Sequence, residues 1–273
     1  LYERIFAVVN NHLPESILDR VRKQRGNRRM AQLFHRTAST KSKQAVSMLN
    51  NSNLDFSTLY ILEPLIKRFD LTKHLSTRNV IALNVIDSIR SARNLSASSN
   101  YKQLQQGDRK NIHYVLSWIV VSGYTEDRLD NDYDEIIDNS AINLIKVYND
   151  RDVLKYMIEL AFDRHVKNRF THDLIWAIFE SRDTSILYCI ADYLKSTSSK
   201  KSYFAEELLN FVPALSKQEN QKKKYEYCVS WLNNNMPWLY FTGQTNQQRP
   251  HPQFAAISHE ARYLGIPVNE SSG

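Results

Sequence analysis

Apolar residues recur every three or four positions along most of this chain, in helix-length segments separated by short polar breaks. The clearest segment is 77–95, where Val80, Ile81, Leu83, Val85, Ile86 and Ile89 form a wide apolar face. The chain has only six glycines, and they lie at or beside breaks in this pattern. Few glycines and long apolar-periodic runs argue against a β-rich fold. The sequence therefore predicts an all-α protein.

Specific residues predict where the helices begin and end. Gly26 with Asn27 marks a break, and Pro64 predicts a kink or a fresh helix start inside the apolar segment 54–69. Asp108 is placed to cap the helix that follows it. We expect 123–134 to be an acidic connector between helices.

Two short segments in the second half of the chain resemble each other at an offset of 31 residues. Residues 147–152 read Val-Tyr-Asn-Asp-Arg-Asp, and residues 178–183 read Ile-Phe-Glu-Ser-Arg-Asp. Each segment joins two helical segments, and we expect Asp152 and Asp183 to cap the second helix of each pair. Over 142–194 the pattern resembles HEAT or armadillo-type helical repeats. That resemblance implies an α-solenoid-like stack of antiparallel helix pairs and no particular function; two short copies can also arise by coincidence.

The chain is expected to have three parts. They are a basic N-terminal helical segment (1–43), a helical-repeat body (44–235) and an extended or irregular C-terminal cap or tail (236–273). The tail holds four of the seven prolines, which prevent continuous helix. Its apolar residues Trp238, Tyr240 and Phe241 either cover the end of the repeat body or form a motif that docks a partner.

The positive charge is concentrated near the N-terminus. Of 36 basic residues, nine lie between Arg20 and Lys43 without any acidic residue, and removing them leaves 27 against 29 acidic ones. The predicted polyanion- or partner-binding residues are Arg20, Arg22, Lys23, Arg25, Arg28, Arg29 and Arg36. Nucleic acid, an anionic membrane surface or an acidic protein face would suit this charge; a merely solvated basic face is the alternative. Phe34 and His35 are the only rings there, which gives base stacking little support.

An acidic segment follows in the middle of the chain, at 126–138. Asp130, Asp132 and Asp134 are spaced like the start of a calcium loop, but Glu135 replaces its glycine and Ala141 occupies the twelfth position. We therefore expect no calcium site of this type. A second hypothesis is self-association, in which these three acids meet the basic segment of another copy.

No catalytic pattern is recognisable. The sequence lacks a glycine-rich phosphate loop, a G-x-S-x-G elbow and an H-E-x-x-H pair. His165 and His172 flank a basic turn, but their spacing does not indicate a metal. We expect no catalytic residues, no metal and no cofactor.

Cysteine usage and hydropathy indicate the cellular compartment in which the protein is expected. Cys189 and Cys228 are interpreted as buried free thiols, which suits a reducing environment. No apolar run reaches the roughly 18 residues that a membrane span needs. The first residues lack a secretory signal, although the chain does not begin with Met and a leader could precede Leu1. We expect a cytoplasmic protein.

These observations favour a non-enzymatic protein-interaction or scaffold module that binds partners on an α-solenoid surface. The alternative is a nucleic-acid-binding helical protein that uses the basic segment. An enzyme whose site is assembled from distant residues is a third possibility, because one sequence does not reveal such a site.

Overall fold

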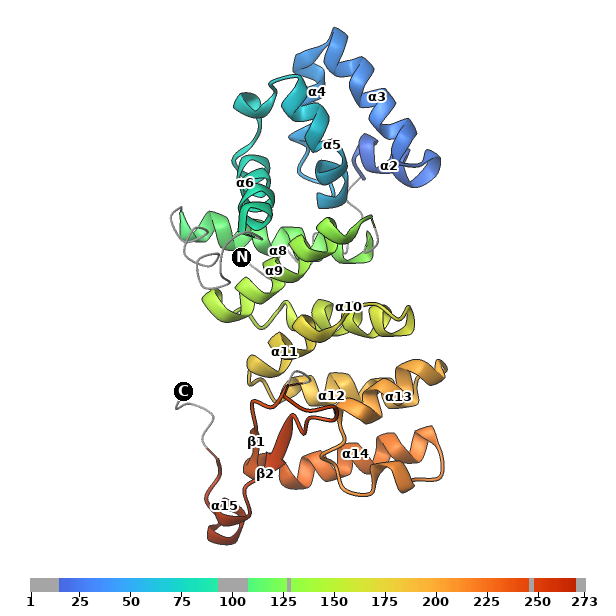
Figure 1. Cartoon of the computed structure of the whole chain (residues 1–273), viewed down its shortest axis with the longest axis vertical. Helices are drawn as coiled ribbons and strands as arrows, with labels where there is room; N and C mark the ends of the chain where they lie inside the picture. Colours follow the sequence, from blue (N-terminus) through green and yellow to red (C-terminus); the bar gives the residue numbers. More distant parts are fainter. Residues whose placement is uncertain (1–14, 93–107, 127–128, 246–247, 269–273) are drawn as a thin grey trace. The chain divides into compact units, whose positions relative to one another are not determined.

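The computed structural model describes residues 15–92, 108–126, 129–245 and 248–268, and these are all-α apart from one short two-stranded sheet (Figure 1). The all-α prediction is therefore confirmed. The chain divides into two compact units, Leu1–Ser140 and Ala141–Gly273. This division falls inside the segment expected to be one helical body, and the expected boundaries at 43 and 235 stay predictions. Residues 1–14 of the expected N-terminal helical segment lie outside the described residues.

The first unit is built from helices that pack on their neighbours. They are α2 (Ile17–Arg25), α3 (Asn27–Thr40), α4 (Ser42–Leu49), α5 (Phe56–Arg68), α6 (Thr77–Ala92), α8 (Arg109–Gly123) and the start of α9 (Asn131–Tyr148). A turn of 3-10 helix, η1 (Thr72–His74), precedes α6, and another, η2 (Tyr124–Glu126), follows α8. Helix α5 contacts α2, α3, α6 and α8, which makes it the centre of this unit. Its buried residues Phe56, Leu59, Leu62 and Ile66 recur at helical spacing and supply that core.

Two expectations for this unit need correction. No new helix starts at Pro64, since α5 runs through this exposed proline; the alternative expectation of a kink stays a prediction. The expected connector over 123–134 is partly helical, since α9 begins at Asn131 and carries Asp132 and Asp134 in its first turn. Acidic side chains are favourable there because they face the positive end of the helix dipole. The predicted cap is confirmed: the Asp108 side chain accepts from the Lys110 N–H.

The second unit continues with paired helices and ends in a small hairpin. It contains the end of α9, α10 (Leu154–Val166), α11 (His172–Glu180), α12 (Ser185–Asp192), α13 (Ser199–Leu208) and α14 (Gln221–Asn235). Short 3-10 turns follow α12, α13 and α14, namely η3 (Tyr193–Lys195), η4 (Leu215–Lys217) and η5 (Met236–Trp238). Helix α10 contacts α11, α12 and α13, and α12 contacts α14. Neighbouring helices thus bury each other's apolar faces.

The tail is more ordered than a wholly irregular segment. Strands β1 (Leu239–Phe241) and β2 (Ala255–Ile257) pair antiparallel, with Tyr240 opposite Ala256. Residues 239–241 are thus extended, whereas Trp238, just before them, lies in the 3-10 turn η5. Helix α15 (His259–Leu264), which the sequence did not predict, follows β2. It begins after Ser258, whose side chain accepts from the Ala261 N–H.

The two similar joints correspond at an offset of 33 residues, not 31. Asn149 and Arg182 each adopt a left-handed backbone (φ 51° and 52°) after α9 and α11, respectively. The next residues are Asp150, which accepts from the Asp152 N–H at 2.9 Å, and Asp183, which accepts from the Ser185 N–H at 2.9 Å. The Asp150 bond lies ahead of α10, which begins at Leu154 without a side-chain cap, so the expected cap by Asp152 is not observed. Arg151 also reaches Asp183 across the two joints, with 3.7 Å between the charged atoms.

The two cysteines differ in exposure. Cys228 is buried as expected, but Cys189 is exposed, so its assignment to the core was wrong. The buried side of α12 is formed by Ile186, Leu187 and Ile190, and Cys189 lies off that face. None of the described helices combines the length and apolar character that a membrane-spanning segment requires.

Candidate polyanion-binding surface

Helix α3 separates an apolar face from an arginine face. Met30, Phe34 and Ala38 recur every four residues and are buried against the unit. The opposite side of the helix therefore presents Arg28 and Arg36, with Arg29 beside them. All three side chains are exposed.

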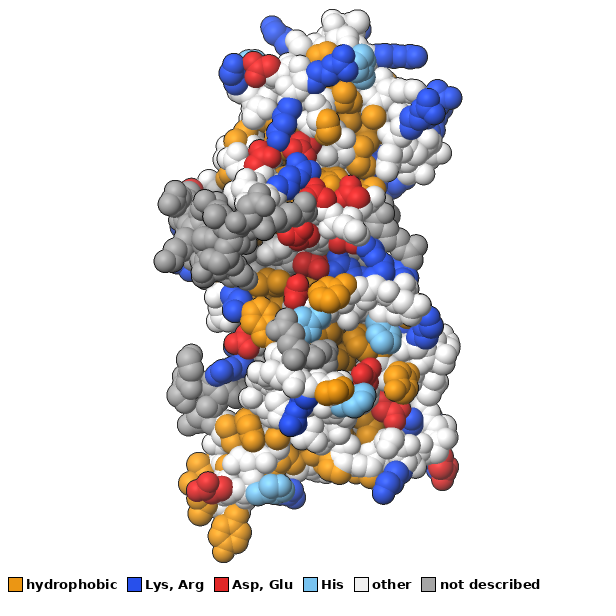
Figure 2. All heavy atoms as spheres, in the orientation of Figure 1, with side chains coloured by type: hydrophobic (Ala, Val, Ile, Leu, Met, Phe, Trp, Pro, Cys, Tyr) orange, Lys and Arg blue, Asp and Glu red, His pale blue; other side chains and the backbone are white. Residues whose placement is uncertain are grey.

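A tight turn brings arginines of α2 close to those of α3. Gly26 has φ +82°, a conformation that L side chains rarely adopt, and it connects the two helices without a loop. Arg25 at the end of α2 is exposed on one side of this turn, and Arg20 is exposed one turn earlier. We call the exposed set Arg20, Arg25, Arg28, Arg29 and Arg36 the arginine surface. Blue side chains are prominent over α2 to α4 in Figure 2.

The arginine surface has no internal counter-charge. Within the described ranges, no carboxylate lies within ion-pair distance of any of its five guanidinium groups. Arg29 bonds to the neutral Gln32 side chain at 3.3 Å. Because these charges are uncompensated and close together, they create a locally positive potential that attracts polyanions.

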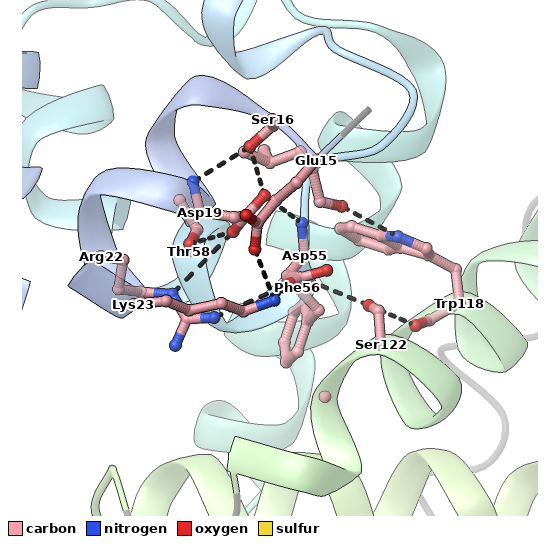
Figure 3. A network of polar contacts seen from close by, with 12 residues as sticks. Glu15, Ser16, Asp19, Arg22, Lys23, Asp55, Phe56, Thr58, Trp118 and Ser122 are labelled. Carbon is pink, nitrogen blue, oxygen red and sulfur yellow. Dashed lines mark hydrogen bonds and ion pairs between the residues drawn. The ribbon is translucent and has the colours of Figure 1, made fainter. Parts of the chain in front are cut away.

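Two residues expected in this site belong to a buried network instead. Arg22 is 5% exposed, and its guanidinium lies 3.4 Å from Asp55 and 3.9 Å from Asp19 (Figure 3). Lys23 contacts Glu15 at 2.8 Å and Asp55 at 3.3 Å. Burial lowers the pKa of Lys23, but the two carboxylates outweigh it and the pKa is raised. The assignment of Arg22 to an exposed binding site was therefore wrong, and Lys23 is only partly available.

Asp19 is the centre of that network. Its fully buried carboxylate accepts from the Thr58 hydroxyl at 2.5 Å, from the Asp55 N–H at 3.0 Å and from the Ser16 hydroxyl (Figure 3). Burial and the neighbouring Asp19 charge raise the pKa of Asp55. These bonds attach α2 to the start of α5. The network therefore fixes the helix that carries Arg20 and Arg25.

The acidic segment is also used inside the first unit. The Tyr60 hydroxyl donates to Asp130 at 2.7 Å and contacts Asp132 at 3.0 Å, and burial raises the Tyr60 pKa. Arg90 donates to Asp132 at 2.8 Å and to the buried Glu63 at 2.6 Å. Asp134 is itself buried. A contact of all three acids with another copy's basic segment would therefore require this network to open.

The arginine surface offers no ring for base stacking. Phe34 is fully buried, and His35 packs edge-on against Phe69 with ring centroids 5.3 Å apart. The arginine surface therefore presents charged and hydrogen-bonding groups and no exposed ring of its own.

The structure separates the apolar residues expected to dock a partner through the tail. Trp238 is half-buried beneath Arg262, whose guanidinium carbon lies 5.5 Å from the ring centroid. Tyr240 is 40% exposed, whereas Phe241 packs on Phe179 because neighbouring strand residues face opposite ways. Phe241 lines a small open pocket, together with Trp176, Phe179, Glu180, Arg182, Gly243, Gln244 and Phe254. The three residues therefore do not form one surface.

Comparisons with protein-family models, with curated proteins and with solved structures found no match for this chain. The histidine, cysteine and carboxylate side chains of the described residues form no group of three or more that would hold a metal ion.

Proposed function

We propose that this chain is a non-enzymatic interaction module whose arginine surface binds the phosphate backbone of a nucleic acid. The observation that carries the proposal is the set of five exposed arginines on α2 and α3 without a carboxylate partner among the described residues. A guanidinium group presents a planar fork of donors that matches phosphate oxygens. Since no described carboxylate holds any of these arginines in an ion pair, binding breaks no such pair.

The surface supports binding that depends on charge and not on base sequence. Its side chains project from two helices joined by a one-residue turn, and the buried Asp19 network fixes the first helix in place. Contacts to phosphates position a protein on a duplex without reading bases. We therefore expect similar affinity for duplexes of different sequence.

Duplex binding by matched variants tests this proposal. The test variant carries Arg28→Ser, Arg29→Ser and Arg36→Ser, and the control carries Lys155→Ser, Lys217→Ser and Lys222→Ser, three exposed lysines of the second unit. Fluorescence anisotropy with a labelled duplex at low salt should show an affinity loss of about tenfold or more for the test variant and little change for the control. No binding by the wild-type chain, or equal losses in both variants, would remove the proposal.

A second candidate function is docking of a protein through the tail, which agrees with the interpretation as a scaffold. Tyr263 is 91% exposed, and Leu264 and Ile266 are each 58% exposed. Neighbouring apolar side chains that remain in water indicate a surface for association. Self-association is the form of docking that can be measured on the purified chain without another protein. Sedimentation velocity should show concentration-dependent association of the wild-type chain that Tyr263→Ser with Leu264→Ser abolishes.

A further inference from the structure

Two segments without acidic residues lie side by side in the second unit. Residues 164–172 and 193–203 contain basic residues but no Asp or Glu. The Lys200 ammonium connects them, because it donates to the Val166 carbonyl at 3.0 Å and to the Asn168 side chain at 3.4 Å. Asn168 has a left-handed backbone (φ 53°) that ends α10 and turns the chain toward Phe170.

Each segment exposes one aromatic ring. Phe170 is 67% exposed and Tyr203 is 66% exposed. Tyr203 lies one helical turn after Lys200 on α13, and Phe170 lies two residues after the Asn168 that Lys200 contacts. The lysine thus brings both rings to one region. Figure 2 shows hydrophobic and histidine side chains close together over α10 to α13.

Buried rings beneath this region hold the two segments in place. Phe204 stacks on His165 with centroids 3.8 Å apart and packs against Phe162 at 5.1 Å. Phe204 takes the buried position on α13, so the adjacent Tyr203 faces solvent. The exposed rings therefore project from a packed core.

The rings lie near cations, Lys167 and Lys200, and also near two acids: Asp173, three residues after Phe170, and Glu207, one helical turn after Tyr203. Neither Lys167 nor Lys200 has a carboxylate partner among the described residues. Lys201, in contrast, forms an ion pair with Asp163, with 2.6 Å between the charged atoms. Exposed rings beside uncompensated cations are the elements of a single-strand site, because bases stack on rings while phosphates contact cations. The arginine surface has the cations but lacks the rings.

We propose that Lys167, Phe170, Lys200 and Tyr203, the lysine–aromatic face, bind single-stranded nucleic acid. Phe170 and Tyr203 stack on unpaired bases, and the two lysines contact the phosphates between them. A duplex binds this face poorly, because its bases are already stacked on one another. The proposal does not rest on the arginine surface, which belongs to the other unit.

Binding of a labelled twelve-nucleotide oligothymidine, with a labelled duplex of equal length beside it, tests the proposal in the full chain. Phe170→Ala with Tyr203→Ala should weaken single-strand binding about tenfold or more and leave duplex binding within about twofold. The matched control is Tyr114→Ala with Tyr240→Ala, which removes two exposed rings outside the lysine–aromatic face and should change neither affinity.

Two outcomes would overturn the proposal: equal single-strand affinity in test and control variants, or no single-strand binding by the wild-type chain. The variant Arg28→Ser, Arg29→Ser, Arg36→Ser distinguishes the two proposals. If only the duplex proposal fails, single-strand binding persists and still depends on Phe170 and Tyr203.

Photo-crosslinking of the wild-type chain gives a readout that does not depend on the folding of a variant. An oligonucleotide containing 5-iodouridine should crosslink within 164–172 or 193–203. Crosslinks found only in α2 and α3, or in no segment of the second unit, would contradict the proposal.

Discussion

Asp19 shows how one buried carboxylate determines the position of a helix. It accepts hydrogen bonds from Thr58, from the Asp55 backbone and from Ser16, and it faces Arg22. Replacing Asp19 with Ala removes these acceptors and one of the carboxylates that face the buried Arg22 charge. We expect the free energy of unfolding to fall by about 3 kcal/mol. Urea denaturation followed by circular dichroism measures this change.

The matched control for Asp19 is an exposed acid in the same unit. Asp70 pairs with Lys73 at 2.9 Å, but both side chains are about three-quarters exposed. Asp70→Asn should therefore cost less than about 1 kcal/mol, because asparagine tolerates the left-handed backbone at this position (φ 51°) and only a surface pair is lost. Equal losses for the two variants would mean that the Asp19 network contributes no more than a surface pair.

His165 makes stability depend on pH. Burial lowers its pKa from 6.5; Glu207 opposes this shift and Lys200 adds to it. The unfolded chain therefore binds the proton at a higher pH than the folded chain. The stability that His165 contributes is fully present above pH 6.5, and it is lost as the pH falls from there toward the folded pKa.

His165→Phe should remove this dependence and keep the stack on Phe204. Urea denaturation at pH 7.5, 6 and 5 should show a smaller loss of stability for this variant than for the wild-type chain. The exposed His74, replaced by Gln, is the control for removing an imidazole outside this stack. An unaltered pH dependence in His165→Phe would contradict the assignment.

At the scale of single residues, the sequence predicted the basic cluster but not the role of each member. Arg22 lies four residues after Leu18, and both are buried on the same side of α2. That spacing was visible, but an arginine on an apolar face is recognised as buried only when its carboxylate partners are known. Asp55, one of those partners, lies 33 residues away.

At the scale of elements, helix ends and turns use left-handed residues that are not glycine. Ala214 has φ 57° at the turn between α13 and α14, and its side chain is exposed. Glycine adopts this conformation without the steric cost that alanine has. Ala214→Gly should raise the free energy of unfolding by about 1 kcal/mol, and thermal denaturation measures the change.

The control for that prediction is the same alanine-to-glycine substitution inside a helix, where it should have the opposite effect on stability. Ala31→Gly on α3 should lower stability by about 1 kcal/mol, because glycine loses more backbone freedom in a helix. A loss of stability in Ala214→Gly as well would contradict the assignment of strain to Ala214.

Helical periodicity predicted most of the described elements because each helix buries one face against a neighbour. It failed where tertiary packing decides the outcome. Similar residues recur in the two joints at an offset of 31 positions. The left-handed residues Asn149 and Arg182 are instead 33 positions apart, so residue identity and backbone conformation give different alignments of the joints. Helix α15 depends on the Ser258 cap and lacks a buried face, so apolar spacing did not reveal it.

At the scale of the molecule, the chain has two compact units with different candidate surfaces. The sequence predicted the arginine surface because nine basic residues without an acid between them are visible in any linear scan. The lysine–aromatic face was missed, because aromatic residues at helical spacing usually belong to a core. Only coordinates distinguish the exposed Tyr203 from the buried Phe204.

The salt dependence of duplex binding measures how many phosphates the arginine surface contacts. If its five arginines each neutralise one phosphate, the logarithm of the association constant should fall with the logarithm of salt concentration with a slope of about −4 to −5. The variant Arg28→Ser, Arg29→Ser, Arg36→Ser should reduce the size of this slope by about 3. An equal slope for variant and wild type, or affinity that does not change with salt, would show that these arginines do not bind the phosphate backbone.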